Sequence, residues 1–317
     1  LQTEQQIKSL LGLGEDYHVL FLQGGATQQF SMIPMAFLQT PSASADYLVS
    51  GYWSQKAMAD AQQQGSVNVL WNGKASGYSH LPRPDELGFN PQAAYFHYIS
   101  NETVEGLQQH QVLGLNGVPR ICDMSSDFLS RPIDAQHFDL IYAHAQKNLG
   151  PAGVTVVVMR DELLQKARHN LPGFLNYHTQ VEAHSNFNTP PVFAIYVVHL
   201  VVSWLQNDVG GLANIGHINQ AKARALYQVI DQSQSFYQGR AAVPDRSWMN
   251  VCFRLPTPEL ETQFLAEASA AGFSGLAGHR STGGLRASLY NGVTLDATQH
   301  LAQWMQAFAH RKNKLPH

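Results

Sequence analysis

The chain has 317 residues, of which 44% are hydrophobic and 14% charged, and its formal net charge is −3. A disordered chain has low hydrophobicity with a high net charge, and a nucleic-acid-binding protein carries a basic excess, so both classes are excluded. The longest apolar run, residues 190–205, is interrupted by Tyr196, His199 and Ser203 and does not predict a membrane span. This length predicts two domains, or one large domain with a smaller partner.

Both cysteines, Cys122 and Cys252, lie in apolar, strand-like stretches. We therefore expect buried, reduced thiols and a cytoplasmic protein. The start of the chain has no basic segment followed by an apolar core, so it does not resemble a signal peptide. Residues 1–13 have the pattern of the middle of a helix and begin with Leu1, not Met. We expect that a natural N-terminal segment precedes them.

Short apolar runs alternate with helical patterns over the first two hundred residues. The expected strands are residues 18–22, 46–49, 66–71, 94–99, 118–122, 140–143 and 154–159, and the expected helices are 26–38, 54–64 and 161–167. This alternation predicts βαβ units and a mostly parallel sheet. The run 154–159 has no polar positions in alternation, which is typical of a strand covered on both faces.

The second part of the chain begins with Thr189 and two prolines, which predict a helix with Thr189 as its N-cap, running to about residue 206. After Gly210 and Gly211 the expected elements are helices 218–232, 258–271 and 295–311 and strands 249–255 and 285–289. The expected fold is α/β: a large domain, residues 1–217, with a mostly parallel central sheet flanked by helices, and a smaller C-terminal α+β domain, residues 218–317.

Two positions at strand ends suit ligand binding. The turn at residues 23–25 leads into a helix that starts with Ala26 and Thr27, where glycine backbone and the helix N-terminus favour a phosphate. It matches neither GxGxxG nor a P-loop, and an ordinary connecting turn is the alternative. Asp123 ends an apolar strand, where ligands meet open α/β sheets, although a turn cap explains it equally well.

Basic and aromatic residues supply further candidates. Lys147 follows a buried strand, and a lysine in an apolar site can react with an aldehyde, whereas an ordinary surface lysine is the alternative. His279, Arg280 and Arg286 surround a glycine turn and suit carboxylate or phosphate, unless they are simple loop charges. Trp53 can stack on a planar ligand or fill the core. The fifteen histidines show no metal-ligand spacing, so we expect no metal site.

Several stretches, taken together and in order, resemble the phosphoserine aminotransferase family over nearly the whole chain. They are residues 21–34 (FLQGGATQQFSMIP), 51–54 (GYWS), 100–106 (SNETVEG), 123–134 (DMSSDFLSRPID), 145–153 (AQKNLGPAG), 187–191 (FNTPP) and 278–291 (GHRSTGGLRASLYN). These enzymes use pyridoxal phosphate (PLP) and have the aspartate-aminotransferase fold, fold type I, class V. The resemblance implies amino transfer between glutamate and 3-phosphooxypyruvate, giving O-phospho-L-serine and 2-oxoglutarate in serine biosynthesis. It leaves open the related four-carbon substrate, 4-phosphohydroxy-L-threonine, of pyridoxine biosynthesis.

The resemblance also implies a role for each matching residue. Lys147 would hold PLP and move the substrate proton, Asp123 would pair with the pyridinium N–H, and Trp53 would stack on the ring. Thr103 would bind the phenolic oxygen, while the phosphate would lie on Ala26, Thr27 and Gln146. Asn188 and Thr189 would reach the phosphate of the other subunit in a homodimer with shared active sites. His279, Arg280 and Arg286 would bind the phosphate and carboxylate groups of the substrates.

Some features depart from the family. The family normally starts with an AsnPhe…GlyPro segment, followed by a HisArg pair that contacts substrate across the dimer, and neither of these N-terminal features is present before the first matching stretch. His144 stands three residues before Lys147, where a small residue is expected, and it either lines the pocket or points into the sheet. Two alternatives stay open: a truncated PLP-binding homodimer without turnover, and a desulfurase-like lyase of the same fold type. The lyase would need a reactive cysteine, for which Cys252 is a poor candidate.

Overall fold

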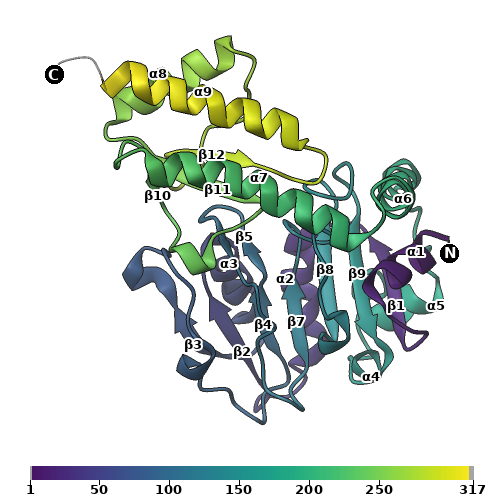
Figure 1. Cartoon of the computed structure of the whole chain (residues 1–317). Coiled ribbons are helices and arrows are strands. Elements are labelled where there is room, and N and C mark those ends of the chain that lie inside the picture. The colour runs from purple at the N-terminus through teal and green to yellow at the C-terminus, as the bar shows by residue number, and fades with distance from the viewer. Residues whose placement is uncertain (1, 314–317) are drawn as a thin grey trace.

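The computed structural model describes residues 2–313 (Figure 1). Leu1 and residues 314–317, which the expected domains include, lie outside the described residues. The helices are α1 (Gln2–Leu11), α2 (Gly25–Phe37), α3 (Tyr52–Ala61), α4 (Asp161–Leu164), α5 (Tyr177–Glu182), α6 (Val192–Asn207), α7 (Leu212–Gln232), α8 (Pro258–Ala270) and α9 (Leu295–Asn313). The strands are β1 (Tyr17–Leu22), β2 (Ser44–Val49), β3 (Ser66–Asn72), β4 (Phe96–Ile99), β5 (Asn101–Glu102), β6 (Leu107–Gln108), β7 (Arg120–Asp123), β8 (Leu140–His144), β9 (Thr155–Arg160), β10 (Gln238–Gly239), β11 (Asn250–Arg254) and β12 (Leu285–Ser288).

The seven strands expected in the first part of the chain form one sheet in the order β1-β9-β8-β7-β4-β2-β3. Strands β8, β7, β4, β2 and β3 are parallel, whereas β9 is antiparallel to both of its neighbours. The prediction of a mostly parallel sheet is therefore confirmed. The expected burial of β9 on both faces is also confirmed, because Val156 and Val158 pack in one core and Val157 and Met159 in another.

Helices cover both faces of this sheet. On one face, Ile7 of α1 and Val198 of α6 pack in the same core as alternate residues of the strands. On the other face, α2 and α3 pack with α4 and α5 against the remaining strand residues. Buried apolar side chains on both faces hold the sheet rigid, so that the carboxyl ends of the parallel strands can present polar groups.

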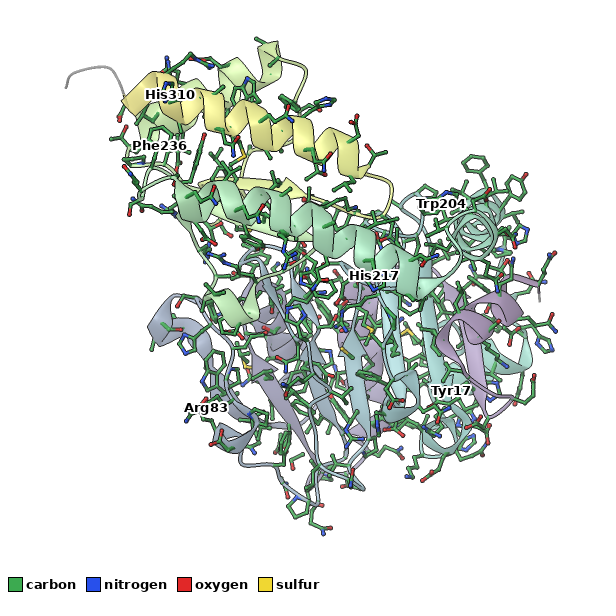
Figure 2. All side chains as sticks on the ribbon, viewed as in Figure 1. Tyr17, Arg83, Trp204, His217, Phe236 and His310 are labelled. Carbon is green, nitrogen blue, oxygen red and sulfur yellow. The ribbon has the colours of Figure 1, made fainter. Side chains whose placement is uncertain are left out.

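A smaller lobe follows, with the antiparallel sheet β10-β11-β12 and the helices α8 and α9. Helix α7 runs from the large lobe into this small one, and side chains fill the space between it and the strands below, with His217 on this helix (Figures 1 and 2). The expected division between residues 217 and 218 falls inside α7. Ile215 packs in the core of the large lobe, and Ala223 packs in the core of the small one.

Three helix predictions need correction. The helix after the two prolines begins at Val192, with Pro191 as its N-cap in place of Thr189. Thr189 could be the N-cap only if Pro190 were the first helical residue, and Pro191 disfavours helical backbone angles at the residue before it. Helix α7 begins at Leu212, six residues earlier than expected, directly after Gly211 with a φ of 96°. Helix α4 ends at Leu164 and is only one turn long.

Within the described part of the chain, no single helix is long and apolar enough to cross a membrane. Helices α6 and α7 meet that criterion only as a pair, and they are bent by 93° where they meet.

Candidate active site

A cavity of about 220 Å³ opens at the carboxyl ends of the central strands. It is lined by Gly25, Ala26, Thr27, Phe30, Trp53, Ile99, Asn101, Thr103, Asp123, Ser125, Ser126, His144, Gln146 and Lys147. Seven of the nine residues expected to bind the cofactor are in this set; Asn188 and Thr189 are not. The loops after β1, β4, β7 and β8 thus bring together side chains that are as much as 121 positions apart in the sequence.

Lys147 lies in the turn after β8, with its amine in the cavity. Its Nζ donates hydrogen bonds to Thr103 Oγ1 at 2.5 Å and Ser126 Oγ at 3.1 Å, and it lies 5.7 Å from the centre of the Trp53 ring. Burial lowers the pKa of Lys147, although the carboxylates of Asp123 and Glu102 oppose this effect. A lowered pKa leaves more of the amine neutral near pH 7, which a nucleophile and proton carrier requires.

Asp123 is the last residue of β7 and is almost fully buried. The backbone N–H of Ser125 donates to its Oδ1 at 2.7 Å. Burial raises the pKa of Asp123, while that hydrogen bond and the charge of Lys147 act in the opposite direction. A buried carboxylate is stable when a cation pairs with it, so this side chain suits a protonated ring nitrogen.

Two buried glutamates in the loop after β4 hold the start of α3, and with it Trp53. Glu102 accepts from the N–H groups of Trp53 at 3.2 Å and Ser54 at 3.0 Å, and Glu105 accepts from Tyr52 N–H at 3.2 Å. Burial raises the pKa of both carboxyl groups. These hydrogen bonds hold the first turn of α3, and with it the backbone that carries Trp53.

The two glutamates are functional residues that the sequence reasoning missed. They lie in the stretch 100–106, whose Thr103 was singled out, but nothing in that stretch showed that it folds against α3. Ser126 was also missed, because nothing in its own stretch, residues 123–134, showed that its side chain meets Thr103 and Lys147. Its hydroxyl lies 2.5 Å from Thr103 Oγ1 and accepts from Lys147, so it is part of the contact network of the amine.

The turn between β1 and α2 is shaped to receive an anion. Gly24 and Gly25 have φ values of 92° and 75°, a region where glycine is strongly favoured. Helix α2 starts at Gly25 with no acidic residue in its first turn, so its free N–H groups and partial positive charge face the cavity edge. This is the arrangement of a phosphate site at a helix N-terminus.

Residues of the small lobe reach the same site. Arg286 on β12 donates from Nη1 to the carbonyl oxygen of Thr103 at 3.2 Å. The His279 ring is centred 5.0 Å from the ring of Tyr52, and Arg280 is exposed beside it. Arg286 therefore contacts a residue of the cavity lining and His279 contacts the residue before Trp53, whereas Arg280 is exposed and makes no such contact within the part of the chain that the structure describes.

Asn188 and Thr189 lie outside the cavity, near the turn before α2. Asn188 Nδ2 donates to Gln23 Oε1 at 3.1 Å, and Gln23 Nε2 donates to the carbonyl oxygen of Thr189 at 2.7 Å. Both contacts are exposed. These two residues are thus at the surface, where they can contact a neighbouring molecule.

The residues of the cavity fit PLP. An amine of lowered pKa suits the aldehyde, a buried carboxylate suits the ring nitrogen, an indole can cover the ring, and a helix N-terminus suits the phosphate. By contrast, residues 2–313 contain no group of three His, Cys, Asp or Glu side chains placed to hold a metal ion.

Neither cysteine fits the role of a reactive thiol. Burial raises the pKa of Cys252 to about 12 and that of Cys122 well above its ordinary value. The thiolate is the nucleophilic form, so both side chains are unreactive near pH 7. This argues against a desulfurase-like lyase.

Comparisons with known proteins identify the family of the chain. The family "Aminotransferase class-V" matches residues 1–301. A phosphoserine aminotransferase of Herpetosiphon aurantiacus is 47% identical over 308 residues, which are 97% of this chain and 85% of that protein. A phosphoserine aminotransferase of Halalkalibacterium halodurans is 48% identical over 304 residues, covering 96% of this chain and 84% of that one.

Solved structures give the same result. The phosphoserine aminotransferase from Bacillus circulans subsp. alkalophilus superposes with a TM-score of 0.95 at 45% identity, covering 98% of this chain and 86% of that one. The PLP-bound phosphoserine aminotransferase from Trichomonas vaginalis superposes with a TM-score of 0.89 at 34% identity, covering 96% of this chain and 86% of that one. The expected fold is therefore confirmed.

Proposed function

Because this chain belongs to the phosphoserine aminotransferase family of PLP-dependent class-V aminotransferases, we propose that it transfers the amino group of glutamate to 3-phosphooxypyruvate. The products are O-phospho-L-serine and 2-oxoglutarate, as in serine biosynthesis, and the reaction takes place in the cytoplasm. The observation that carries this proposal is the placement of Lys147 between Thr103 and Ser126, in one cavity with Asp123 and Trp53.

Each residue of the cavity has a distinct task in this reaction. When bound, PLP supplies an electron sink for the charge that develops at the substrate Cα. Lys147 would hold the cofactor through its amine; once the substrate amine has taken its place, the freed Nζ would take the proton from the substrate Cα and deliver it to the cofactor. Asp123 keeps a proton on the ring nitrogen. Trp53, held by Glu102, covers one face of the ring and excludes water.

The substrate is recognised by cations of the small lobe. Arg286 is held by the carbonyl oxygen of Thr103, a residue of the cofactor site, so its guanidinium lies close to the reacting atoms. His279 contacts Tyr52, next to Trp53, and the exposed Arg280 follows it in the chain. Guanidinium groups bind carboxylate and phosphate through paired hydrogen bonds, and every substrate of this reaction carries at least two such anionic groups. The same set suits the four-carbon phosphorylated acid of pyridoxine biosynthesis.

A homodimer completes the proposed site. Helix α6 presents an apolar face to solvent, with Val192 67% exposed, Phe193 75% and Tyr196 56%. Exposed apolar residues grouped in this way are typical of an interaction surface. Asn188 and Thr189 stand directly before this helix, so a second copy seated on α6 would receive them beside its own PLP phosphate.

The cofactor role of Lys147 is tested by its substitution. Lys147→Ala is expected to fold normally but to hold no PLP that borohydride can trap, whereas Lys166→Ala, at an exposed lysine, should behave as wild type. The visible absorbance of bound PLP should change on addition of glutamate or phosphoserine. An absorbance that never responds would favour the alternative of a cofactor-binding dimer without turnover.

Substrate recognition is tested with Arg286→Ala. Loss of this guanidinium should weaken phosphoserine binding by about 2–5 kcal/mol and leave PLP binding nearly unchanged. Arg83→Ala, at an exposed arginine far from the cavity, is the matched control. Equal loss of phosphoserine and PLP binding would mean that Arg286 is structural.

The dimer is tested by sedimentation. Phe193→Asp combined with Tyr196→Asp should give monomers that release PLP more readily. Val243→Asp, at a residue 69% exposed in the small lobe, should leave the dimer intact. A dimer that survives the double substitution on α6 would show that its interface lies elsewhere.

A further inference from the structure

His144 is a cavity residue to which neither the sequence patterns nor the proposed reaction gives a task. It is the last residue of β8 and lies opposite Thr155 of β9, which in turn lies opposite Leu22 of β1. Tyr142, two residues earlier on β8, packs in the core on the α2 side of the sheet. Side chains two residues apart in a strand share a face, so His144 points toward α2. Of the two readings of the sequence, the structure supports the one in which His144 lines the pocket.

The His144 ring is held at one nitrogen. Its Nδ1 lies 2.9 Å from the hydroxyl of the fully buried Thr155, and its backbone N–H donates to Ser125 Oγ at 3.2 Å. The backbone of Val154 also forms a hydrogen bond with the ring, and among the described residues no side chain forms one with His144 Nε2. The ring is thus oriented by the strand beside it, and Nε2 is the atom left to meet a ligand in the cavity.

The position in the sheet places His144 at the phosphate end of the cavity. Leu22 ends β1, and the glycine turn that leads to Ala26 and Thr27 follows it directly. Helix α2 passes over β8, because the Phe30 and Tyr142 rings meet edge to face at 6.3 Å. Asp123, which suits the ring nitrogen, lies on β7, on the other side of β8 from β1. The residues nearest to His144 across the cavity are therefore those of the anion site.

We propose that His144 donates a hydrogen bond from Nε2 to the phosphate group of PLP, as an additional ligand beside the α2 N-terminus. This inference deepens the proposed function and rests on its cofactor site, but not on the choice of substrate. The Thr155 hydroxyl can donate to Nδ1 or accept from it; when it donates, the proton of a neutral ring lies on Nε2, the tautomer that this proposal requires. Burial lowers the pKa of His144 and the nearby charge of Lys147 adds to this effect, while a hydrogen bond to the backbone of Val154 acts in the opposite direction.

The test compares PLP with pyridoxal, which has the same ring and aldehyde but no phosphate. The apoenzyme of wild type and of His144→Ala is titrated with each compound, and binding is followed by visible absorbance. Loss of one hydrogen bond to a charged group should weaken PLP binding about tenfold to a hundredfold. Pyridoxal binding should change less than about twofold, because the lost contact involves only the phosphate.

A second variant and a second readout make the result decisive. His144→Gln keeps an N–H donor and should recover part of the PLP affinity, whereas Gln165→Ala, at an exposed residue, should change nothing. The phosphorus NMR signal of bound PLP should shift in His144→Ala relative to wild type. Equal weakening of PLP and pyridoxal, or an unchanged phosphorus signal, would overturn the proposal. If wild type itself failed to bind PLP, the cofactor site would be wrong, which is a different outcome.

Discussion

A chain of buried asparagines joins the turn of Lys147 to the small lobe and allows a quantitative prediction. Asn148, next to the lysine, accepts from the backbone N–H of Asn291 at 2.8 Å. The Asn291 side chain donates to the carbonyl oxygen of Leu129 at 2.9 Å and accepts from Asn219 of α7 at 2.8 Å. Asn219 also donates to the carbonyl oxygen of Ser130 at 2.8 Å. We compare Asn291→Ala with Asn219→Ala.

The two substitutions remove the same number of hydrogen bonds but differ in what remains. Asn291→Ala loses two bonds of about 1 kcal/mol each and leaves the Leu129 carbonyl unpaired, for a total cost of about 2–3 kcal/mol. Asn219→Ala also loses two bonds and leaves the Ser130 carbonyl and Asn291 Oδ1 unpaired, for a cost of about 2–4 kcal/mol. However, Asn219 Oδ1 is buried and has no hydrogen-bond partner among residues 2–313, and its removal recovers about 1–3 kcal/mol. The net cost of Asn219→Ala should therefore be about 1–2 kcal/mol, below that of Asn291→Ala.

Urea unfolding at one fixed protein concentration measures this difference, with the fluorescence of the tryptophans as the signal. Gln220→Ala, at the exposed neighbour of Asn219 on α7, is the control and should stay within about 0.5 kcal/mol of wild type. Asn219→Ala that costs as much as Asn291→Ala would refute the reasoning, since the unpaired oxygen would then carry no penalty.

Two further predictions concern other buried charges. Burial and Glu102 raise the pKa of Glu105 to about 8, so the folded state holds a proton that the unfolded state loses near pH 4.5, and stability falls as pH rises between these values. Glu105→Gln should remove this fall in the free energy of unfolding, which urea unfolding measures at several pH values. If the free energies of wild type and Glu105→Gln changed in parallel from pH 5.5 to 8, the prediction would be wrong. Lys222 Nζ donates to the carbonyl oxygens of Leu289, Tyr290 and Val293. Lys222→Met should cost at least about 3 kcal/mol in urea unfolding, and a cost below about 1 kcal/mol would argue against these bonds.

The local pattern of apolar residues was enough to predict the strands of the large lobe. The seven strands lie within two residues of their predicted bounds, because buried strands need continuous runs of β-branched and aromatic residues. Lys147, Asp123 and Trp53 were predicted from motifs at strand ends, and the structure brings all three to one cavity, because these strand ends open on the same edge of the sheet. The predicted helix ends were less accurate than the predicted strand ends. At Val192 and Leu212, prolines and glycines decide the first helical residue through backbone angles that composition does not convey.

What the sequence by itself determined was the α/β class and the strands of the large sheet, because these depend on residues close together in the chain; the roles of the cofactor-site residues stay a prediction from family resemblance. Only the tertiary structure decided which distant groups meet. It placed β9 antiparallel between β1 and β8, brought Glu102 and Glu105 under the start of α3, and set His144 opposite Thr155 beside the anion site. Such contacts depend on strand order and on desolvation inside the packed fold, and neither can be predicted from a local stretch of residues.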